Sequence, residues 1–151
     1  MSPRLEVVSF GYGHEDTPAA DITIDVRQRF RDPHTSPALR ALTGKHPDVY
    51  VKVAAYPGVR DLIAHTYRAA LTLASLGPAP VTVAFGCVGG RHRSVVLADL
   101  LYRRALGTRL PGGVILQTSI RHCHIDLPVL ARQGEPSPDD SGITTVAGEE
   151  C

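Results

Sequence analysis

The chain has 151 residues, of which 43% are hydrophobic and 21% charged, so it is long enough for one compact domain and too apolar to be wholly disordered. Its formal net charge is only +1, but a basic centre lies between two acidic ends, and Lys45 and Lys52 are the only lysines among the 16 basic residues. Three cysteines are too few for a disulfide scaffold, and no secretory leader or membrane-spanning apolar run is visible, so we expect a reduced, cytoplasmic protein with no membrane partner.

The first third of the chain predicts two strands and a loop. Residues 4–10 and 20–26 are rich in β-branched residues, and the second run alternates between polar and apolar side chains, which is typical of strands. Residues 28–48 contain three prolines, so we expect an irregular loop with at most one helical turn, ending at Gly44.

Helices and strands alternate in the rest of the chain. Apolar residues recur at helical spacing in residues 57–76 and 94–106, and strands are predicted at residues 80–85 and 114–120, the first of them central and covered on both faces. This alternation predicts an α/β fold, a single layered domain with a mostly parallel sheet. We place the domain at residues 1–133 and a disordered acidic tail at residues 134–151.

The strongest chemical signal is the glycine-rich segment between the strand at 80–85 and the following helix. Its small residues allow backbone N–H groups to point inward, and the start of the helix adds its positive dipole. The segment therefore predicts an anion nest at the centre of the sheet, with Arg93 at the surface of a cleft and facing a phosphate. The alternative interpretation is that Arg93 forms an ion pair with Asp25 instead of facing a phosphate. The segment comprises Gly86, Cys87, Val88, Gly89, Gly90, Arg91, His92, Arg93 and Ser94.

The same segment permits an enzymatic interpretation. Cys87 and Arg93 fit the C-x5-R-S spacing of cysteine-dependent phosphatases, in which Cys87 would be the nucleophile and either Asp25 or Asp32 the general acid. The opposing interpretation is that Cys87 is a small buried residue at a strand end. The run His122, Cys123, His124 has no second ligand pair at zinc-finger spacing, so we predict no metal site and expect polar rim residues there.

The sequence GCVGGRHRSVVLADLL resembles the corresponding block in the C-terminal domain of RapZ-type RNase adapter proteins. The blocks VVSFGYGH, DITIDVRQRFRDPH, LRALTG and SIRHCHID match in the same order, so the resemblance covers residues 5–126. It implies an α/β domain that senses an amino-sugar phosphate such as glucosamine-6-phosphate and binds RNA. The ligand residues carried over from it are Asp25, His34, Gly89, Gly90, His92, Arg93 and Ser94, and Arg91 keeps the positive charge before His92.

Our first hypothesis is therefore a non-catalytic sensor domain for a phosphorylated small molecule, an amino-sugar phosphate or a nucleotide sugar, with no cofactor. The second is an RNA-binding adapter, in which Arg27, Arg29 and Arg31 form either a phosphate-contacting stripe or an ordinary solvated face. Full-length relatives carry an N-terminal P-loop NTPase domain that this sequence lacks, so a separate NTPase or a ribonuclease is an expected partner. A homo-oligomer is compatible with this hypothesis.

Overall fold

The computed structural model describes residues 2–30, 33, 36–130 and 151 and contains one four-stranded sheet. The strands are β1 (Arg4–Gly11), β2 (Ile22–Asp25), β3 (Val81–Cys87) and β4 (Gln117–His122). Their order across the sheet is β2-β3-β1-β4, and every pairing is parallel. The predicted α/β fold with a parallel sheet is thus confirmed, and all four strands end at the same edge.

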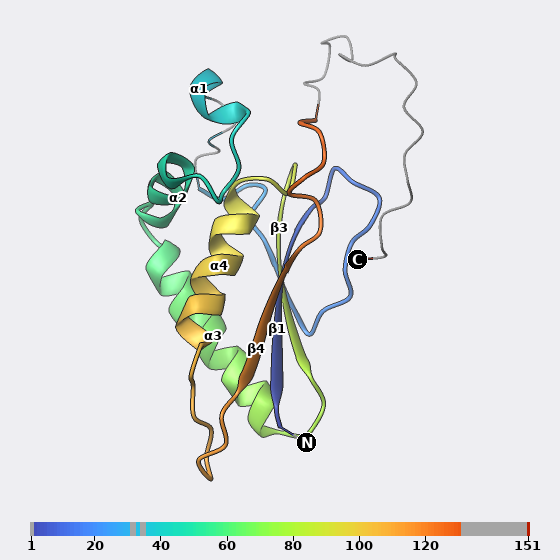
Figure 1. Cartoon of the computed structure of the whole chain (residues 1–151), viewed down its shortest axis with the longest axis vertical. Coiled ribbons are helices and arrows are strands. Elements are labelled where there is room, and N and C mark those ends of the chain that lie inside the picture. The colour runs from blue at the N-terminus through green and yellow to red at the C-terminus, as the bar shows by residue number, and fades with distance from the viewer. Residues whose placement is uncertain (1, 31–32, 34–35, 131–150) are drawn as a thin grey trace.

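Four helices lie on one side of this sheet (Figure 1). They are α1 (Pro37–Arg40), α2 (Pro47–Ala54), α3 (Val59–Ser75) and α4 (Arg93–Ala105). The two long helices confirm the predictions from helical spacing, because buried residues such as Val59, Ile63 and Ala70 recur along α3 at that spacing. None of the helices in the described ranges is long and apolar enough to cross a membrane.

Residues 47–54 form a helix that begins within the loop predicted for residues 28–48 and continues into residues for which no element was predicted. Pro47 is at the first helical position, where its missing N–H costs nothing, and the His46 ring accepts the N–H of Asp48. Val49 and Val53 are four residues apart and pack against Val96 of α4. Pro47 therefore marks the start of a helix rather than a position within a loop.

The last strand begins three residues later than predicted. Gly112 and Gly113 have positive φ angles, and the N–H of Leu110 donates to the Val114 carbonyl, so a tight turn precedes the strand. Ile115 pairs with Arg109 in an isolated antiparallel bridge before β4 starts at Gln117.

The two faces of the sheet carry separate apolar clusters. Val83 and Phe85 of β3 belong to the larger cluster together with Leu97 and Leu101 of α4. Val8, Phe10 and Ala84 form a smaller one on the opposite face, with Tyr12, Ala20 and Cys123 packed against it. β3 is thus buried on both sides, as predicted for residues 80–85.

The cysteines depart from the expected reduced state. Cys123 and Cys151 form a disulfide, whereas Cys87 is a free, buried thiol. The prediction of a fully reduced protein is wrong for this pair, because Cys123 follows directly on β4 and Cys151 lies beside it. Apart from Cys151, the acidic tail predicted for residues 134–151 lies outside the described residues.

Candidate functional site

The glycine-rich loop lies at the edge where all four strands end. Because the strands are parallel, β1 ends at Gly11, β2 at Asp25, β3 at Cys87 and β4 at His122 on this common carboxyl edge. Residues 88–92 follow the inner strand β3 and lead directly into α4 (Figure 1). In open α/β sheets this is the edge at which ligands bind.

The loop is pressed against the end of β1. The N–H of Tyr12 donates to the Cys87 carbonyl at 2.8 Å, and the N–H of Gly13 donates to the Val88 carbonyl at 2.9 Å. A Cβ on Gly11 would lie 2.5 Å from the carbonyl carbon of Gly89, so no side chain fits there. Gly90 has a φ of +71°, which favours glycine, and is equally crowded. Two glycines therefore allow the close approach of two backbones.

Gly89 differs from Gly11 and Gly90 in its surroundings. A Cβ built on Gly89 would meet no atom within 4 Å, and its φ lies outside the left-handed region. The residue is half-buried, and its α-carbon faces open space above the carboxyl edge. Packing therefore does not require glycine at this position, and the backbone there is open to approach from outside.

Arg93 is buried instead of facing a cleft. The residue is only 3% exposed. Nη1 of its guanidinium donates to the carbonyls of Val26, Arg27 and Arg29 at 3.0, 3.1 and 2.9 Å. The expectation of a surface position is wrong, because the chain after β2 turns its carbonyls toward α4. Arg93 thus holds the 26–30 segment in place beside the glycine loop.

The two residues before Arg93 make similar contacts to other loops. His92 is 5% exposed, and its Nε2–H donates to the Leu42 carbonyl at 2.7 Å. Arg91 donates from Nη2 to the Ala41 carbonyl at 3.1 Å, and from Nη1 to the carbonyls of Ile125 and Leu127 at 3.1 and 2.6 Å. The loop between β3 and α4 is therefore tied to three other segments of the carboxyl edge.

Asp25 forms an exposed cluster with Arg27 and Tyr12. The carboxylate pairs with the Arg27 guanidinium at 2.7 Å, and this guanidinium lies 3.9 Å from the centre of the Tyr12 ring. The pKa of Asp25 is lowered by its hydrogen bonds from Arg27, while burial and the nearby Asp25 raise the pKa of Tyr12. Asp25 therefore pairs with Arg27 rather than with Arg93.

Of the remaining predicted residues, one is on the surface and three lie outside the described part of the chain. Arg29 is exposed, and its Nη1 donates to the carbonyl of its neighbour Gln28 at 3.2 Å. Arg31, Asp32 and His34 lie outside the described residues. The arginine stripe and the role of His34 stay predictions.

The sequence indicates no role for His14 and predicts that His124 is a polar rim residue, but His124 is 4% exposed. The two rings lie 4.5 Å apart, and the Gly11 N–H donates to Nδ1 of His124 at 2.8 Å. His14 Nε2 lies 3.3 Å from the Gly89 carbonyl. Burial, and then the neighbouring His14, lower the pKa of His124. The signal for His14 was its place in the block VVSFGYGH.

His122 and Cys123 are separated from this histidine pair. His122 Nδ1 lies 2.6 Å from the Ser9 hydroxyl, and Cys123 is in the disulfide. Among the described residues, no group of three or more His, Cys, Asp or Glu side chains could hold a metal ion.

Cys87 and Ser94 face each other inside the domain. The Cys87 sulfur lies 3.1 Å from the Ser94 hydroxyl and accepts the Gly90 N–H at 3.3 Å. Both residues are buried, and Cys87 belongs to the core cluster beneath the helices. A phosphatase nucleophile requires an accessible thiolate beside an arginine that faces the phosphate. Here the thiol is 3% exposed, and Arg93 Nη1 donates to backbone carbonyls.

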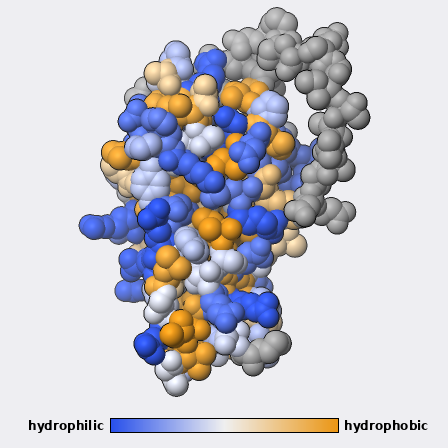
Figure 2. Space-filling model, viewed as in Figure 1, coloured by the Kyte–Doolittle hydropathy of each residue, from blue (hydrophilic) through white to orange (hydrophobic). Residues whose placement is uncertain are grey.

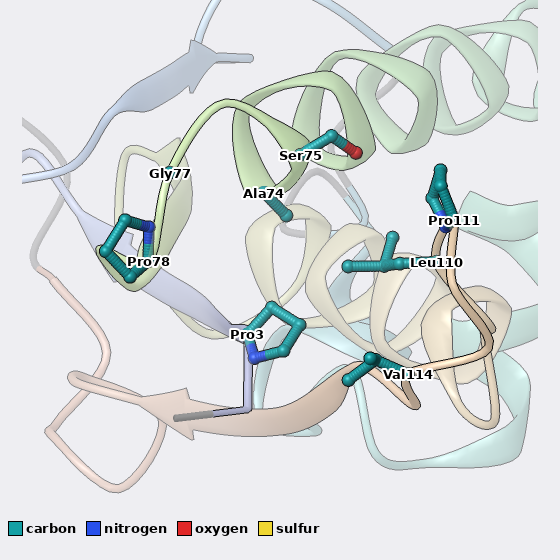
Figure 3. A pocket seen from close by; sticks show the side chains of 8 residues that line it. All are labelled: Pro3, Ala74, Ser75, Gly77, Pro78, Leu110, Pro111 and Val114. Carbon is teal, nitrogen blue, oxygen red and sulfur yellow. The ribbon is translucent and has the colours of Figure 1, made fainter.

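A separate cavity of about 300 Å³ lies at the opposite edge of the sheet, by the start of β1 (Figure 3). Its lining side chains are apolar except for that of Ser75, whose hydroxyl donates to the Leu71 carbonyl within α3. No charged side chain lines this cavity to fix a phosphorylated ligand. It is lined by Pro3, Ala74, Ser75, Gly77, Pro78, Leu110, Pro111 and Val114.

Comparison with known proteins matches most of the chain to one family. The profile described as RapZ C-terminal domain covers residues 3–126. A protein of Rubrobacter xylanophilus named as a nucleotide-binding protein is 40% identical over 128 residues, which is 81% of this chain and 41% of that protein. A nucleotide-binding protein of Thermus thermophilus is 44% identical over 106 residues, which is 68% of this chain and 38% of that protein. The chain thus spans less than half of the length of these relatives.

Proposed function

The chain belongs to the RapZ C-terminal domain family, and from this premise we propose that it is a non-catalytic sensor domain for a phosphorylated small molecule. The ligand is an amino-sugar phosphate or a nucleotide sugar, and its phosphate lies over Gly89 at the carboxyl edge of the sheet. The observation that supports this proposal most strongly is the open space at Gly89 within a loop that is otherwise tightly packed.

The physical basis is a preorganised backbone. Arg91, His92 and Arg93 tie the loop to three neighbouring segments, so its conformation is set before a ligand arrives. The loop leads into the amino terminus of α4, and the His92 side chain does not cap that helix. Backbone N–H groups at such a terminus attract phosphate through hydrogen bonds and the helix dipole. Rigidity lowers the entropic cost of binding there.

Polar side chains on both sides of the loop suit the rest of such a ligand. Asp25 and Arg27 are exposed next to Tyr12. The carboxylate oxygens of Asp25 retain lone pairs that can accept hydrogen bonds from sugar hydroxyls. His14 lies on the other side, near the Gly89 carbonyl. In this proposal Arg93 acts as a positioning residue, because it holds the 26–30 segment, which contains Arg27 and directly follows Asp25.

The relatives support the ligand class. The Rubrobacter and Thermus proteins are named as nucleotide-binding proteins, and a nucleotide carries the phosphate that this loop suits. Binding of RNA through Arg27 and Arg29, and association with a P-loop NTPase or a ribonuclease, are separate proposals carried by the family resemblance. Steep loss of RNA affinity with rising salt would be the signature of the first.

Calorimetric titration tests the proposal with glucosamine-6-phosphate, UDP-N-acetylglucosamine, free glucosamine and inorganic phosphate. We expect saturable binding of at least one of the two phosphorylated sugars and weaker binding of the fragments. Absence of binding by all four compounds would contradict the proposal. Release of phosphate from the sugar phosphate by the wild type, lost in Cys87→Ser, would favour the phosphatase hypothesis instead.

A further inference from the structure

A second candidate binding surface lies among the helices and is independent of the proposed sensor function. A groove of about 230 Å³ lies between α3 and α4, with the end of α2 beside it. Its floor is apolar, since Val59 and Ile63 are 1% and 6% exposed. On the face drawn in Figure 2, small apolar patches likewise lie among hydrophilic side chains. The groove is lined by Ala54, Val59, Arg60, Ile63, Leu100 and Arg104.

The groove has a positive rim. Arg60 and Arg104 are exposed, and in the described part of the chain neither forms a salt bridge. The Arg104 guanidinium lies 5.0 Å from the centre of the Tyr67 ring, a contact that leaves its positive charge unpaired by a carboxylate. Of the acidic residues nearby, Asp99 on α4 is paired with Arg103 at 2.6 Å, and Asp61 in the first turn of α3 forms no salt bridge with either rim arginine.

We propose that this groove binds an acidic segment of a partner protein. One or two apolar side chains of that segment would occupy the floor at Ile63 and Leu100, and its carboxylates would pair with Arg60 and Arg104. The volume is below that of typical metabolite pockets but sufficient for such side chains. Arginine favours bidentate contacts with carboxylates, and complementary charge at the rim speeds association.

The apolar floor favours a peptide over RNA. Phosphates would pair with the two arginines but would offer no apolar group to the partly exposed Leu100 side chain in the groove. Recognition of single-stranded RNA relies on aromatic faces for stacking, and no aromatic residue lines this groove. Tyr67, beside it, already carries Arg104 over its ring.

The test uses the whole chain, isotopically labelled, and follows backbone amide signals by NMR during titration. The probe is the peptide acetyl-Glu-Glu-Leu-Glu-Glu-Leu-Leu-Glu-amide, and its control has Ser in place of each Leu. We expect the probe to shift the signals of Ile63 and Leu100, and the control peptide to bind about tenfold more weakly or not at all, because it cannot fill the apolar floor.

Charge variants complete the test. The double variant Arg60→Glu and Arg104→Glu should bind the probe at least about tenfold more weakly, because both carboxylate partners become repulsive. Arg68→Glu, an exposed change on the same helix, is the matched control and should leave binding unchanged. If the double reversal does not fold, the single neutralisations Arg60→Gln and Arg104→Gln replace it.

Three results would overturn the proposal. The probe could leave Ile63 and Leu100 unshifted, or the serine peptide could bind as well as the leucine peptide. Arg68→Glu could also weaken binding as much as the double variant does. A single-stranded RNA that shifts these signals when the peptide does not would identify a nucleic-acid surface instead.

Discussion

Gly90 lies against the backbone of Gly11, so closely that a Cβ on Gly90 would be 2.7 Å from the amide nitrogen of Gly11. The same Cβ would be 2.9 Å from the Cβ of His124. The glycine loop after β3, the end of β1 and the segment after β4 thus meet at one point. This contact fixes the height of the loop above the sheet, and with it the position of the open side at Gly89.

Gly90→Ala should destabilise the protein by about 3 kcal/mol, because it adds a clash with backbone atoms to a positive φ. Gly107→Ala is the matched control, since Gly107 has a similar φ of +72° and open space around it. That variant should lose only about 1 kcal/mol. Urea unfolding measures both, and equal losses would show that crowding at Gly90 is not the cause.

Arg93→Ala should both unfold the protein more easily and weaken ligand binding. Loss of the guanidinium removes its hydrogen bonds to the carbonyls of Val26, Arg27 and Arg29, of which the Val26 carbonyl still accepts the Arg29 N–H, and this loss costs about 3 kcal/mol. Arg27→Ala, which removes an exposed partner of Asp25, should change the unfolding free energy little. Thermal melts of the two variants distinguish them, and an Arg93→Ala protein as stable as wild type would contradict the structural role.

Stability should fall as the pH drops below the ordinary histidine pKa of about 6.5. The pKa values of His124 and His122 are lowered in the folded protein, first of all by burial, so the unfolded chain takes up protons that the folded one refuses. The stability these groups contribute is fully present above the unfolded pKa. It is lost progressively as the pH falls toward the folded values.

His124→Asn isolates one of the two contributions. The amide oxygen can replace Nδ1 as acceptor for the Gly11 N–H, but it does not titrate. The change in melting temperature between about pH 7.5 and about pH 5.5 should be smaller in this variant than in wild type. His65→Asn, an exposed change on α3, is the control. An undiminished pH dependence in His124→Asn would refute the assignment to His124.

The number of reactive thiols tests the cysteine pairing. In the native protein none of the three cysteines should react quickly with a thiol reagent, because Cys87 is 3% exposed and the other two form a disulfide. Denaturation without a reductant should expose only Cys87. Reduction in denaturant should release all three, and two additional thiols before reduction would contradict the pairing.

The sequence was sufficient to predict most of the fold, because local patterns set it. Apolar, β-branched runs identified β1, β2 and β3, with alternation visible only for β2, and the helical spacing of Val59, Ile63 and Ala70 identified α3. α2 was missed because Pro47 serves equally in a loop or at a helix start, and only packing of Val49 and Val53 on α4 decides between them. The partner of Cys123 was likewise not predictable from local sequence.

The site was predictable in position but not in the roles of its side chains. The glycine loop is at the carboxyl edge as the strand–loop–helix pattern required. The direction of Arg93, however, depends on carbonyls from residues 26–29, which the sheet brings beside α4 from a distant part of the chain. His124 was ambiguous for the same reason, since its partner Gly11 is 113 residues away in the sequence.

The most direct test of the sensor proposal is calorimetric titration of wild type and Gly89→Ala with glucosamine-6-phosphate and UDP-N-acetylglucosamine, paired with the melting temperature of each protein. A Cβ at residue 89 meets no protein atom within 4 Å, so the fold and melting temperature should be unchanged. The added methyl group should occupy the space of the phosphate and weaken binding at least about tenfold, or about 1.4 kcal/mol. Unchanged affinity in a stable Gly89→Ala protein would contradict a ligand over Gly89.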